Sequence, residues 1–310
     1  MSDYINDDYC TRTPVALFVF NRPQTTARVF TAIAHARPSN LLIIADGPRP
    51  GRGDDDLCAQ TRQIVQRIDW PCQVSTHFAT VNLGCRERIS SGLTWVFEHV
   101  ESAIVLEDDC LPHPSFFRFC DELLVRHSEH PQVMHICGSN YLPSATPPTA
   151  SYYFSKYAYI WGWATWRRAW RHYDLSMSRW ELAAFWAERF SGSTELEKRY
   201  WQSTWRGVAR GRYDTWDVQW VLSCIAQGGL SVVPGVNLVS NIGGGPGSTH
   251  AQEDRLLNQP AYPLPLPLRH PERIESDGNA DGAVIARLAS LSSRPLWRRM
   301  LARIVPTRFK

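Results

Sequence analysis

The chain has 310 residues, of which 44% are hydrophobic and 20% are charged, as in a folded globular protein. This composition excludes a disordered chain, a collagen-like repeat and a coiled coil. The formal net charge of +3 is too small to indicate nucleic acid as a partner, although the basic side chains divide unevenly into 30 Arg and 3 Lys. The 13 Trp are a second imbalance, because ten of them lie between positions 161 and 220.

The cysteines and the apolar runs predict a cytosolic protein. Eight Cys are scattered without a CxxC pair or a close His partner, which favours reduced thiols over a disulfide framework or a zinc site. The first residues, MSDYINDDYCTRTP, are polar and acidic, unlike a signal peptide. The longest apolar runs, such as Val15–Phe20, fall far below the roughly 18 residues of a membrane span.

Short apolar runs alternate with helical patterns through the first half of the chain. Strands are predicted over residues 15–20, 41–45, 73–79, 103–106 and 133–137, and helices over 25–36, 55–68, 86–99 and 115–127. This alternation predicts an α/β fold with a mostly parallel sheet flanked by helices. Polar residues follow four predicted strands, at the edge where open α/β sheets bind ligands: Asn21, Asp46, Asn82 and Asp108.

The second half of the chain follows a different pattern. Residues 161–228 predict several helices rich in Trp. Residues 230–240 predict a pair of strands around a Pro-Gly turn, and a final helix is expected over residues 281–304.

Three consecutive carboxylates, Glu107, Asp108 and Asp109, follow the apolar strand predicted at 103–106. Neighbouring carboxylates repel one another, so a cation that neutralises them is favoured. Mg²⁺ and Mn²⁺ suit oxygen ligands and keep open positions for substrate phosphates. An acidic loop with a helix-capping Asp is the alternative. The chain has no GxGxxG motif after the first strand and no GxxxxGK[ST] motif, which argues against a dinucleotide fold and a P-loop.

The ordered set of strand-end and aromatic motifs resembles the GT-A-fold glycosyltransferases. The similarity is to the group of N-acetylglucosaminyltransferase I and to bacterial haemolytic-protein-like glycosyltransferases. It rests on Phe20–Pro23, Ala45–Gly47, Asn82–Gly84, Leu106–Asp109, Trp161–Trp166, Trp216–Asp217 and Asn237–Ile242. The resemblance implies a Rossmann-like GT-A fold in three parts: a nucleotide-sugar-binding half at 1–140, a Trp-rich helical acceptor half of the same domain at 141–258, and a Pro-rich linker with a basic helix at 259–310.

The resemblance also implies roles for the acidic motif. Asp109 would bind the Mn²⁺ or Mg²⁺ ion that bridges the diphosphate, Asp108 would contact the ribose or a metal-bound water, and Glu107 would contact the donor sugar. The other implied donor contacts are Asn21 and Arg22 at the base and phosphate, Asp46 at the base, and Arg86 at the diphosphate. The chemistry agrees independently, because a metal ion and an Arg stabilise a diphosphate that gains charge as it leaves.

A Trp-Asp pair in the second half carries the expected general base. In the resembling family a Trp-Asp in this region begins a helix and supplies the carboxylate that takes the proton from the acceptor hydroxyl, which an inverting transfer requires. Asp217 matches by position and Asp214 is the reserve candidate; an ordinary helix cap is the alternative. The family's Asp-Asp pair is here Asp217-Val218, which departs from the pattern.

Three further features complete the candidate site. The resemblance makes His250, at the end of a Gly-rich run that starts at Gly243, the candidate second metal ligand, with an exposed loop His as the alternative. Trp161 and Trp163 are the candidates for stacking on an acceptor sugar, with burial in the core as their rival. The basic amphipathic segment 294–310 fits a docking helix or a contact with an anionic inner-membrane face.

The expected function is a metal-dependent inverting glycosyltransferase. The donor is expected to be a UDP-sugar, and the acceptor a glycan or lipid-linked glycan of bacterial surface polysaccharide or lipopolysaccharide. One alternative is a sugar-nucleotide nucleotidyltransferase, although that class carries a Gly-rich basic loop where Asn21–Pro23 stands here. The other is a noncatalytic carbohydrate-binding protein on a GT-A scaffold, against which the complete set of acidic candidates argues.

Overall fold

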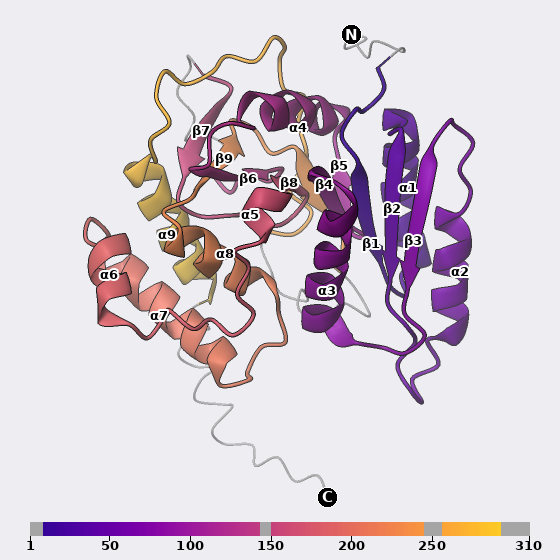
Figure 1. Cartoon of the computed structure of the whole chain (residues 1–310), viewed down its shortest axis with the longest axis horizontal. Coiled ribbons are helices and arrows are strands. Elements are labelled where there is room, and N and C mark those ends of the chain that lie inside the picture. Colours follow the sequence, from indigo (N-terminus) through magenta and orange to yellow (C-terminus); the bar gives the residue numbers. More distant parts are fainter. Residues whose placement is uncertain (1–8, 143–149, 245–255, 293–310) are drawn as a thin grey trace, which may run out of the picture.

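A computed structural model describes residues 9–142, 150–244 and 256–292. One eight-stranded sheet runs through these residues in the order β3-β2-β1-β4-β8-β6-β9-β7 (Figure 1). Strands β1 to β4, β6 and β9 point one way, and β7 and β8 are antiparallel to their neighbours. The predicted α/β class with a mostly parallel sheet is confirmed.

The strands of the large sheet are β1 (Val15–Val19), β2 (Asn40–Ala45), β3 (Gln73–Phe78), β4 (Ser102–Glu107), β6 (Val133–Cys137), β7 (Tyr152–Ser155), β8 (Trp163–Trp166) and β9 (Leu230–Pro234). A small antiparallel sheet joins β5 (Cys110–Pro112) to β10 (Val239–Asn241). This small sheet matters for the site, because it brings the chain near residue 241 back to the end of β4.

The helices are α1 (Pro23–Ala36), α2 (Asp55–Val65), α3 (Gly84–His99), α4 (Pro114–Arg126), α5 (Arg167–Trp170), α6 (Ala183–Arg189), α7 (Glu195–Ala209), α8 (Asp217–Ala226) and α9 (Gly278–Ser292). None of the described helices is both long and apolar enough to cross a membrane.

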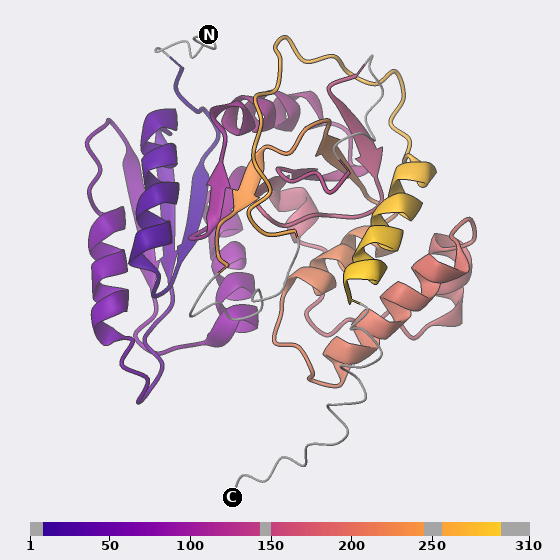
Figure 2. The same ribbon diagram turned by 180° about the vertical axis from the view of Figure 1, so that it is seen from behind.

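The central strands are short apolar runs because both faces of the sheet are covered. Val15, Leu17 and Val19 of β1 pack with α1 and α4 on one face. Ala16 and Phe18 pack with α3 and with the aromatic residues of the second half on the other. Figures 1 and 2 show α3 and α1 on opposite sides of the sheet. Continuous burial removes the polar alternation of a half-exposed strand, as expected for a parallel sheet.

The strand order places a ligand-binding edge between β1 and β4. From β1 the sheet grows in both directions, to β2 on one side and to β4 on the other. The chain leads from β1 to β2 on one side and from β4 toward β6 on the other, so the order reverses between β1 and β4, the position where such sheets bind ligands. Proline at the first turn of α1 fixes where the helix starts after β1.

The second half corrects two predictions. Residues Trp163–Trp166 were expected to be helical and form strand β8, between β4 and β6. Because all four residues are buried, the tetrapeptide has no alternation that marks a strand. Residues 230–240 do hold two strands, but β9 pairs with β6 and β7 whereas β10 pairs with β5. The final helix ends, within the described residues, at Ser292.

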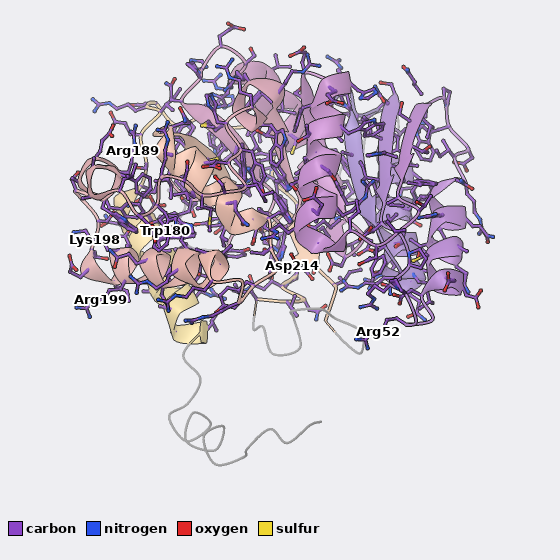
Figure 3. The ribbon with its side chains drawn as sticks, turned by 60° about the horizontal axis from the view of Figure 1, so that its bottom comes forward. Arg52, Trp180, Arg189, Lys198, Arg199 and Asp214 are labelled. Carbon is purple, nitrogen blue, oxygen red and sulfur yellow. The ribbon has the colours of Figure 1, made fainter. Side chains whose placement is uncertain are left out.

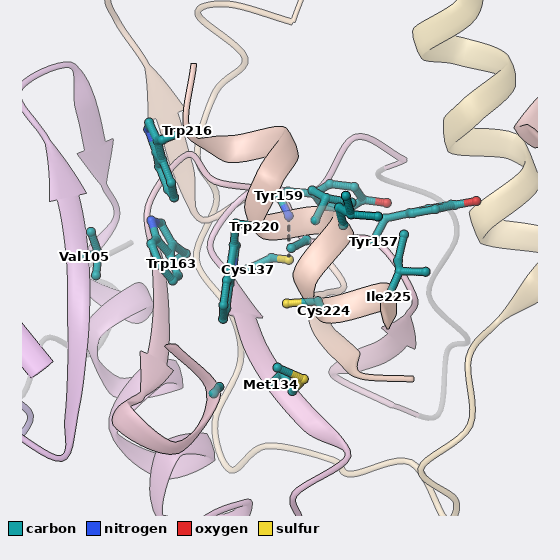
Figure 4. Packing of buried hydrophobic residues seen from close by; sticks show 14 of the residues in the cluster. Val105, Met134, Cys137, Tyr157, Tyr159, Trp163, Trp216, Trp220, Cys224 and Ile225 are labelled. Carbon is teal, nitrogen blue, oxygen red and sulfur yellow. Dashed lines mark hydrogen bonds between the residues drawn. The ribbon is translucent and has the colours of Figure 1, made fainter. Parts of the chain in front are cut away.

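Most of the clustered Trp residues belong to the hydrophobic core. Seven of the ten between positions 161 and 220 are at most 5% exposed. Figure 4 shows Trp163, Trp216 and Trp220 packed together between β8 and α8. A buried aromatic ring removes a large apolar area from water, so this cluster accounts for much of the stability expected of the second half.

Candidate functional site

The acidic motif at the end of β4 meets the end of β1. The backbone N–H of Phe20 donates to Asp108 Oδ2 over 3.0 Å. Arg22 Nη1 lies 2.7 Å from Asp109 Oδ2 and 3.9 Å from Asp108 Oδ1. The structure therefore brings together Arg22, Asp108 and Asp109, three of the predicted strand-end residues.

The acidic motif carries more negative charge than Arg22 neutralises. Burial, reinforced by Asp109, raises the pKa of Asp108 to about 7, although Arg22 and the Phe20 N–H oppose the shift. The pKa of Glu107 is also raised. Burial is the largest cause, and the negative charges of three neighbours add to it: Asp109, Asp108 and Asp217. Among the described residues no cation forms an ion pair with Glu107. A site with this imbalance favours a bound cation.

The segment after β10 closes on the acidic motif. The N–H of Ile242 donates to the carbonyl of Asp109 over 2.8 Å, and Asn241 Oδ1 accepts the N–H of Gly243 over 2.9 Å. A Cβ on Gly243 would overlap Asp109 Oδ2. Gly243 thus lets the backbone approach a carboxylate. The sequence marked this stretch as the start of a Gly-rich loop and missed the contact, which depends on the pairing of β10 with β5.

The donor set fits a hard cation that binds together with phosphates. In the described part of the chain no three His, Cys, Asp or Glu side chains are arranged to hold a metal ion by themselves. His250, the predicted second ligand, lies outside the described residues. Mg²⁺ and Mn²⁺ take oxygen ligands and use one or two carboxylates together with waters and substrate phosphates. Asp109 and Asp108 can supply those carboxylates.

Both candidate bases lie beside the acidic motif. Asp217 is the first residue of α8, and the Thr215 hydroxyl donates to its Oδ1. The charge of Asp217 contributes to the raised pKa of Glu107. The pKa of the Cys85 thiol, near the start of α3, is raised by burial and then by four surrounding carboxylates: Glu107, Asp217, Asp214 and Asp109. Residues far apart in the chain are thus gathered at one place.

Arg86 faces the loop before α8. Its Nε lies 3.7 Å from Asp214 Oδ1, and both side chains are about half exposed, at 47% and 59%. Gly84 begins α3 with a φ of +79°, and a Cβ there would lie 3.2 Å from Asp214 Oδ2. The ion pair therefore links the first turn of α3 to the loop before α8.

Asp46 organises the turn that leads into α3. Its carboxylate accepts the N–H groups of Gly47, Leu83 and Gly84 and the side-chain amide of Asn82, at 2.8–3.2 Å. These bonds engage both oxygens within the described structure. A contact between Asp46 and the nucleotide base stays a prediction. The hydrogen bonds of Asp46 also give it a structural role, because they hold the turn before α3.

A second polar network, which the sequence did not single out, lies beside Asn21. The Asn21 amide donates to Asp54 Oδ1 over 2.8 Å, and Arg49 binds the same carboxylate through Nε and Nη2, at 2.6 and 3.0 Å. The Arg49 hydrogen bonds lower the pKa of Asp54 to about 2. The run of three Asp from position 54 marks a helix start in the sequence, and nothing there signals its contact with the end of β1.

The two aromatic candidates for the acceptor site differ. Trp163 is 1% exposed and its ring stacks on His135 and Trp216. Trp163 is a core residue in this structure. Other aromatic groups cover its ring, so the ring has no exposed face for the predicted stacking on an acceptor sugar. Trp161 is only partly buried and meets Tyr141 edge to face at 5.7 Å. Trp161 remains the aromatic candidate from that segment.

Comparisons with known proteins do not assign a family or a function to the chain. No family model and no curated protein matches the chain. One similar solved structure is a mannosyltransferase from Pyrobaculum calidifontis in complex with GDP-Man and Mn²⁺, with 10% identity, 71% of this chain and 72% of that chain covered, and a TM-score of 0.37. Another is a UDP-glucose pyrophosphorylase complexed with UDP-glucose, with 10% identity, 71% and 90% covered, and a TM-score of 0.35.

Proposed function

We propose that the chain is a metal-dependent, inverting glycosyltransferase. Its donor is a nucleotide-diphosphate sugar, with UDP as the first nucleotide to test. Its acceptor is a glycan or lipid-linked glycan of bacterial surface polysaccharide or lipopolysaccharide. The observation that carries the proposal is the meeting of Glu107–Asp109 with Arg22 and Asp217 at the switch point of the sheet.

The proposal assigns separate tasks to the two sides of the site. Asp109 and Asp108 hold the divalent ion, which supplies positive charge to the diphosphate when bound. Arg22 and Arg86 add cationic hydrogen-bond donors to the diphosphate as it leaves. Glu107 contacts the donor sugar. The crowded carboxylates of the acidic motif support this arrangement, because a bound cation would favour the charged form that burial and mutual repulsion disfavour.

Asp217 is the general base of the proposal. Its carboxylate takes the proton from the acceptor hydroxyl while the new bond forms at the anomeric carbon and the bond to the diphosphate breaks. Direct attack from the face opposite the leaving group inverts the configuration. Asp217 stands at the first turn of α8, and a helix N-terminus interacts favourably with negative charge.

A donor screen tests the proposal. The full-length chain is incubated with a panel of nucleotide-diphosphate sugars with and without Mn²⁺, and the released nucleotide diphosphate is measured. One donor should be hydrolysed slowly in the presence of Mn²⁺, and Asp109→Asn should lower that rate about a hundredfold. Asp69→Asn is the matched control, because Asp69 is an exposed aspartate between α2 and β3. Release from no donor, or an undiminished rate in Asp109→Asn, contradicts the proposal.

A further inference from the structure

Helix α7 ends in a turn that folds the chain back onto the helix. Gly211 has a left-handed φ of +69°, and its N–H donates to the carbonyl of Val208 over 2.8 Å. The N–H of Arg212 donates to the carbonyl of Gly207 over 3.0 Å. These two bonds form the glycine-dependent end of a helix. Because the chain reverses here, Tyr213 returns to α7 and its ring lies over Gly207.

The Tyr213 ring packs directly on Gly207 of α7. A Cβ at position 207 would lie 2.5 Å from Tyr213 Cε2, so any larger residue would displace the ring. The ring nevertheless stays 51% exposed, whereas Gly207 beneath it is buried. A fixed aromatic ring that keeps an exposed surface is suited to stack on the apolar face of a sugar.

Exposed arginines lie close in sequence to Tyr213 and Gly207. Arg199, Arg206 and Arg210 recur at spacings of seven and four, so they share one side of α7, and Arg212 follows in the turn. All four are exposed, and within the described residues no carboxylate lies at ion-pair distance from any of them. The acidic residues at the other end of α7 differ, because Glu195 is paired with Lys198. This surface is complementary to an anionic ligand.

The arginine surface leads directly to the candidate site. Asp214 follows Tyr213 in the chain and lies 3.7 Å from Arg86, the residue expected at the diphosphate. Figure 3 looks onto the face that carries Arg199 and Asp214, together with Arg52 from the connection after β2. A ligand lying along α7 would therefore reach the mouth of the site.

We propose that Tyr213 with Arg206, Arg210 and Arg212 forms an acceptor subsite for a saccharide chain that bears anionic groups. Tyr213 stacks on a sugar ring, and the guanidinium groups bind carboxylates or phosphates of neighbouring sugars. This inference rests on the proposed function, because it assigns the acceptor class to the same site. Carboxylate and phosphate groups offer the same recognition chemistry, so the test includes both.

Binding of anionic oligosaccharides to the full chain tests the subsite without any donor. The probes are an oligogalacturonate and a phosphorylated oligomannoside, with a neutral oligomaltoside for comparison, measured by calorimetry. The wild type should bind at least one anionic probe about tenfold more tightly than the neutral one. The triple variant Arg206→Gln, Arg210→Gln, Arg212→Gln should weaken that binding about tenfold or more. The preferred probe tells whether carboxylate or phosphate is recognised.

Two controls separate a specific subsite from general charge attraction. The triple variant Arg28→Gln, Arg67→Gln, Arg269→Gln makes the same charge change at exposed positions on other elements, and should bind within about twofold of the wild type. Tyr213→Ala should weaken binding of all saccharides, and Tyr213→Phe should restore it. An equal loss in both triple variants, or unchanged binding in Tyr213→Ala, overturns the subsite.

The remaining outcomes are also decisive. Absence of binding to both anionic probes overturns the subsite. Binding to phosphatidylglycerol vesicles, with loss in the α7 triple variant and none to the oligosaccharides, would make this face a membrane contact and overturn it as well. Donor hydrolysis in a chain that binds no anionic saccharide leaves the proposed function intact and removes only the subsite. Saccharide binding in a chain that hydrolyses no donor contradicts the proposed function, and with it the acceptor role of the surface, and leaves only a saccharide-binding surface.

Discussion

The two halves of the molecule differ in which residues they concentrate and in whether those residues stabilise the fold. The half built on β1 to β4 gathers carboxylates and arginines at the strand ends, where Asp108 and Glu107 are buried beside like charges. The half from β7 to α8 gathers aromatic rings, and most of these are buried. Buried like charges destabilise a fold, whereas buried rings stabilise it. The unfavourable cluster therefore points to function, and the conspicuous Trp cluster mainly to structure.

The contrast extends to His135 of β6, which is buried and stacks on Trp163 of the aromatic half. His135 donates through Nε2 to the Tyr159 carbonyl over 3.0 Å, and its Nδ1 accepts the Trp220 indole N–H over 3.1 Å. This pair of bonds fits the neutral ring. A titratable group beside the aromatic cluster is thus buried in its neutral form, whereas the buried carboxylates at the end of β4 have raised pKa values that a bound cation would lower.

Removal of a core ring should have the largest effect on stability. Trp220 is fully buried and hydrogen-bonded to His135, so Trp220→Ala should lower the free energy of unfolding by about 3–5 kcal/mol. Trp161→Ala is the comparison, because Trp161 is only partly buried and should lose less stability. Urea unfolding followed by tryptophan fluorescence measures both. A loss below about 1 kcal/mol in Trp220→Ala would contradict the assignment of this ring to the core.

Replacement of the proposed base should act on transfer and spare binding. Asp217→Asn should keep the affinity for nucleotide and Mn²⁺ but lower sugar transfer about a hundredfold or more, because the amide cannot accept the proton. Asp214→Asn is the matched variant and should have a smaller effect. The measurement is transfer at saturating donor. The opposite ranking of the two variants would make Asp214 the base, and two active variants would remove the base from this loop.

The pH dependence of stability tests the neutral histidine. Burial lowers the pKa of His135 to about 3, well below its ordinary value. The unfolded chain binds the proton first, so stability is full above about pH 6.5 and is lost as the pH falls toward 3. Between pH 7 and 4.5 the stability advantage of the wild type over His135→Gln should shrink by about 2–3 kcal/mol, measured by urea unfolding. An advantage that stays constant over this range would contradict a neutral buried His135.

The smallest expected effect concerns the start of the arginine-bearing helix. Thr194 and Glu197 form a reciprocal cap, in which Thr194 Oγ1 accepts the Glu197 N–H at 3.2 Å and Glu197 Oε2 accepts the Thr194 N–H at 2.8 Å. Thr194→Ala should lower the free energy of unfolding by about 1 kcal/mol. Thr194→Ser keeps the hydroxyl and should restore it. An unchanged stability in Thr194→Ala would mean that the cap does not hold α7.

The strands of the sheet half could be predicted because each one is marked by the pattern of its own residues. Buried parallel strands are continuous apolar runs, and β1, β2 and β4 follow theirs closely. Strands β7 and β8 were not predicted. They are short and buried, and each pairs antiparallel with a strand distant in sequence, so no local pattern marks them. Tertiary burial there outweighs the local pattern.

The candidate site follows the same division. Arg22 and the acidic motif could be predicted, because both directly follow strands that meet at the switch point. The contacts of Gly243 with Asp109 and of Asn21 with Asp54 depend on chain crossings that spacing alone cannot reveal. The packing of Tyr213 on Gly207 likewise could not be predicted, because it depends on the left-handed turn at Gly211.

The melting temperature with and without UDP and Mn²⁺ tests the central claim most directly, because it reports binding to the acidic motif without requiring an acceptor. At concentrations near a hundred times the dissociation constant, binding stabilises a protein by about 2.7 kcal/mol, which for a chain of this size is a rise of roughly 5 °C. We expect this rise in the wild type and in Asp69→Asn, only with both UDP and the ion present, and its loss in Asp109→Asn. An equal rise in Asp109→Asn, or no rise with any nucleotide diphosphate and either Mn²⁺ or Mg²⁺, would contradict it.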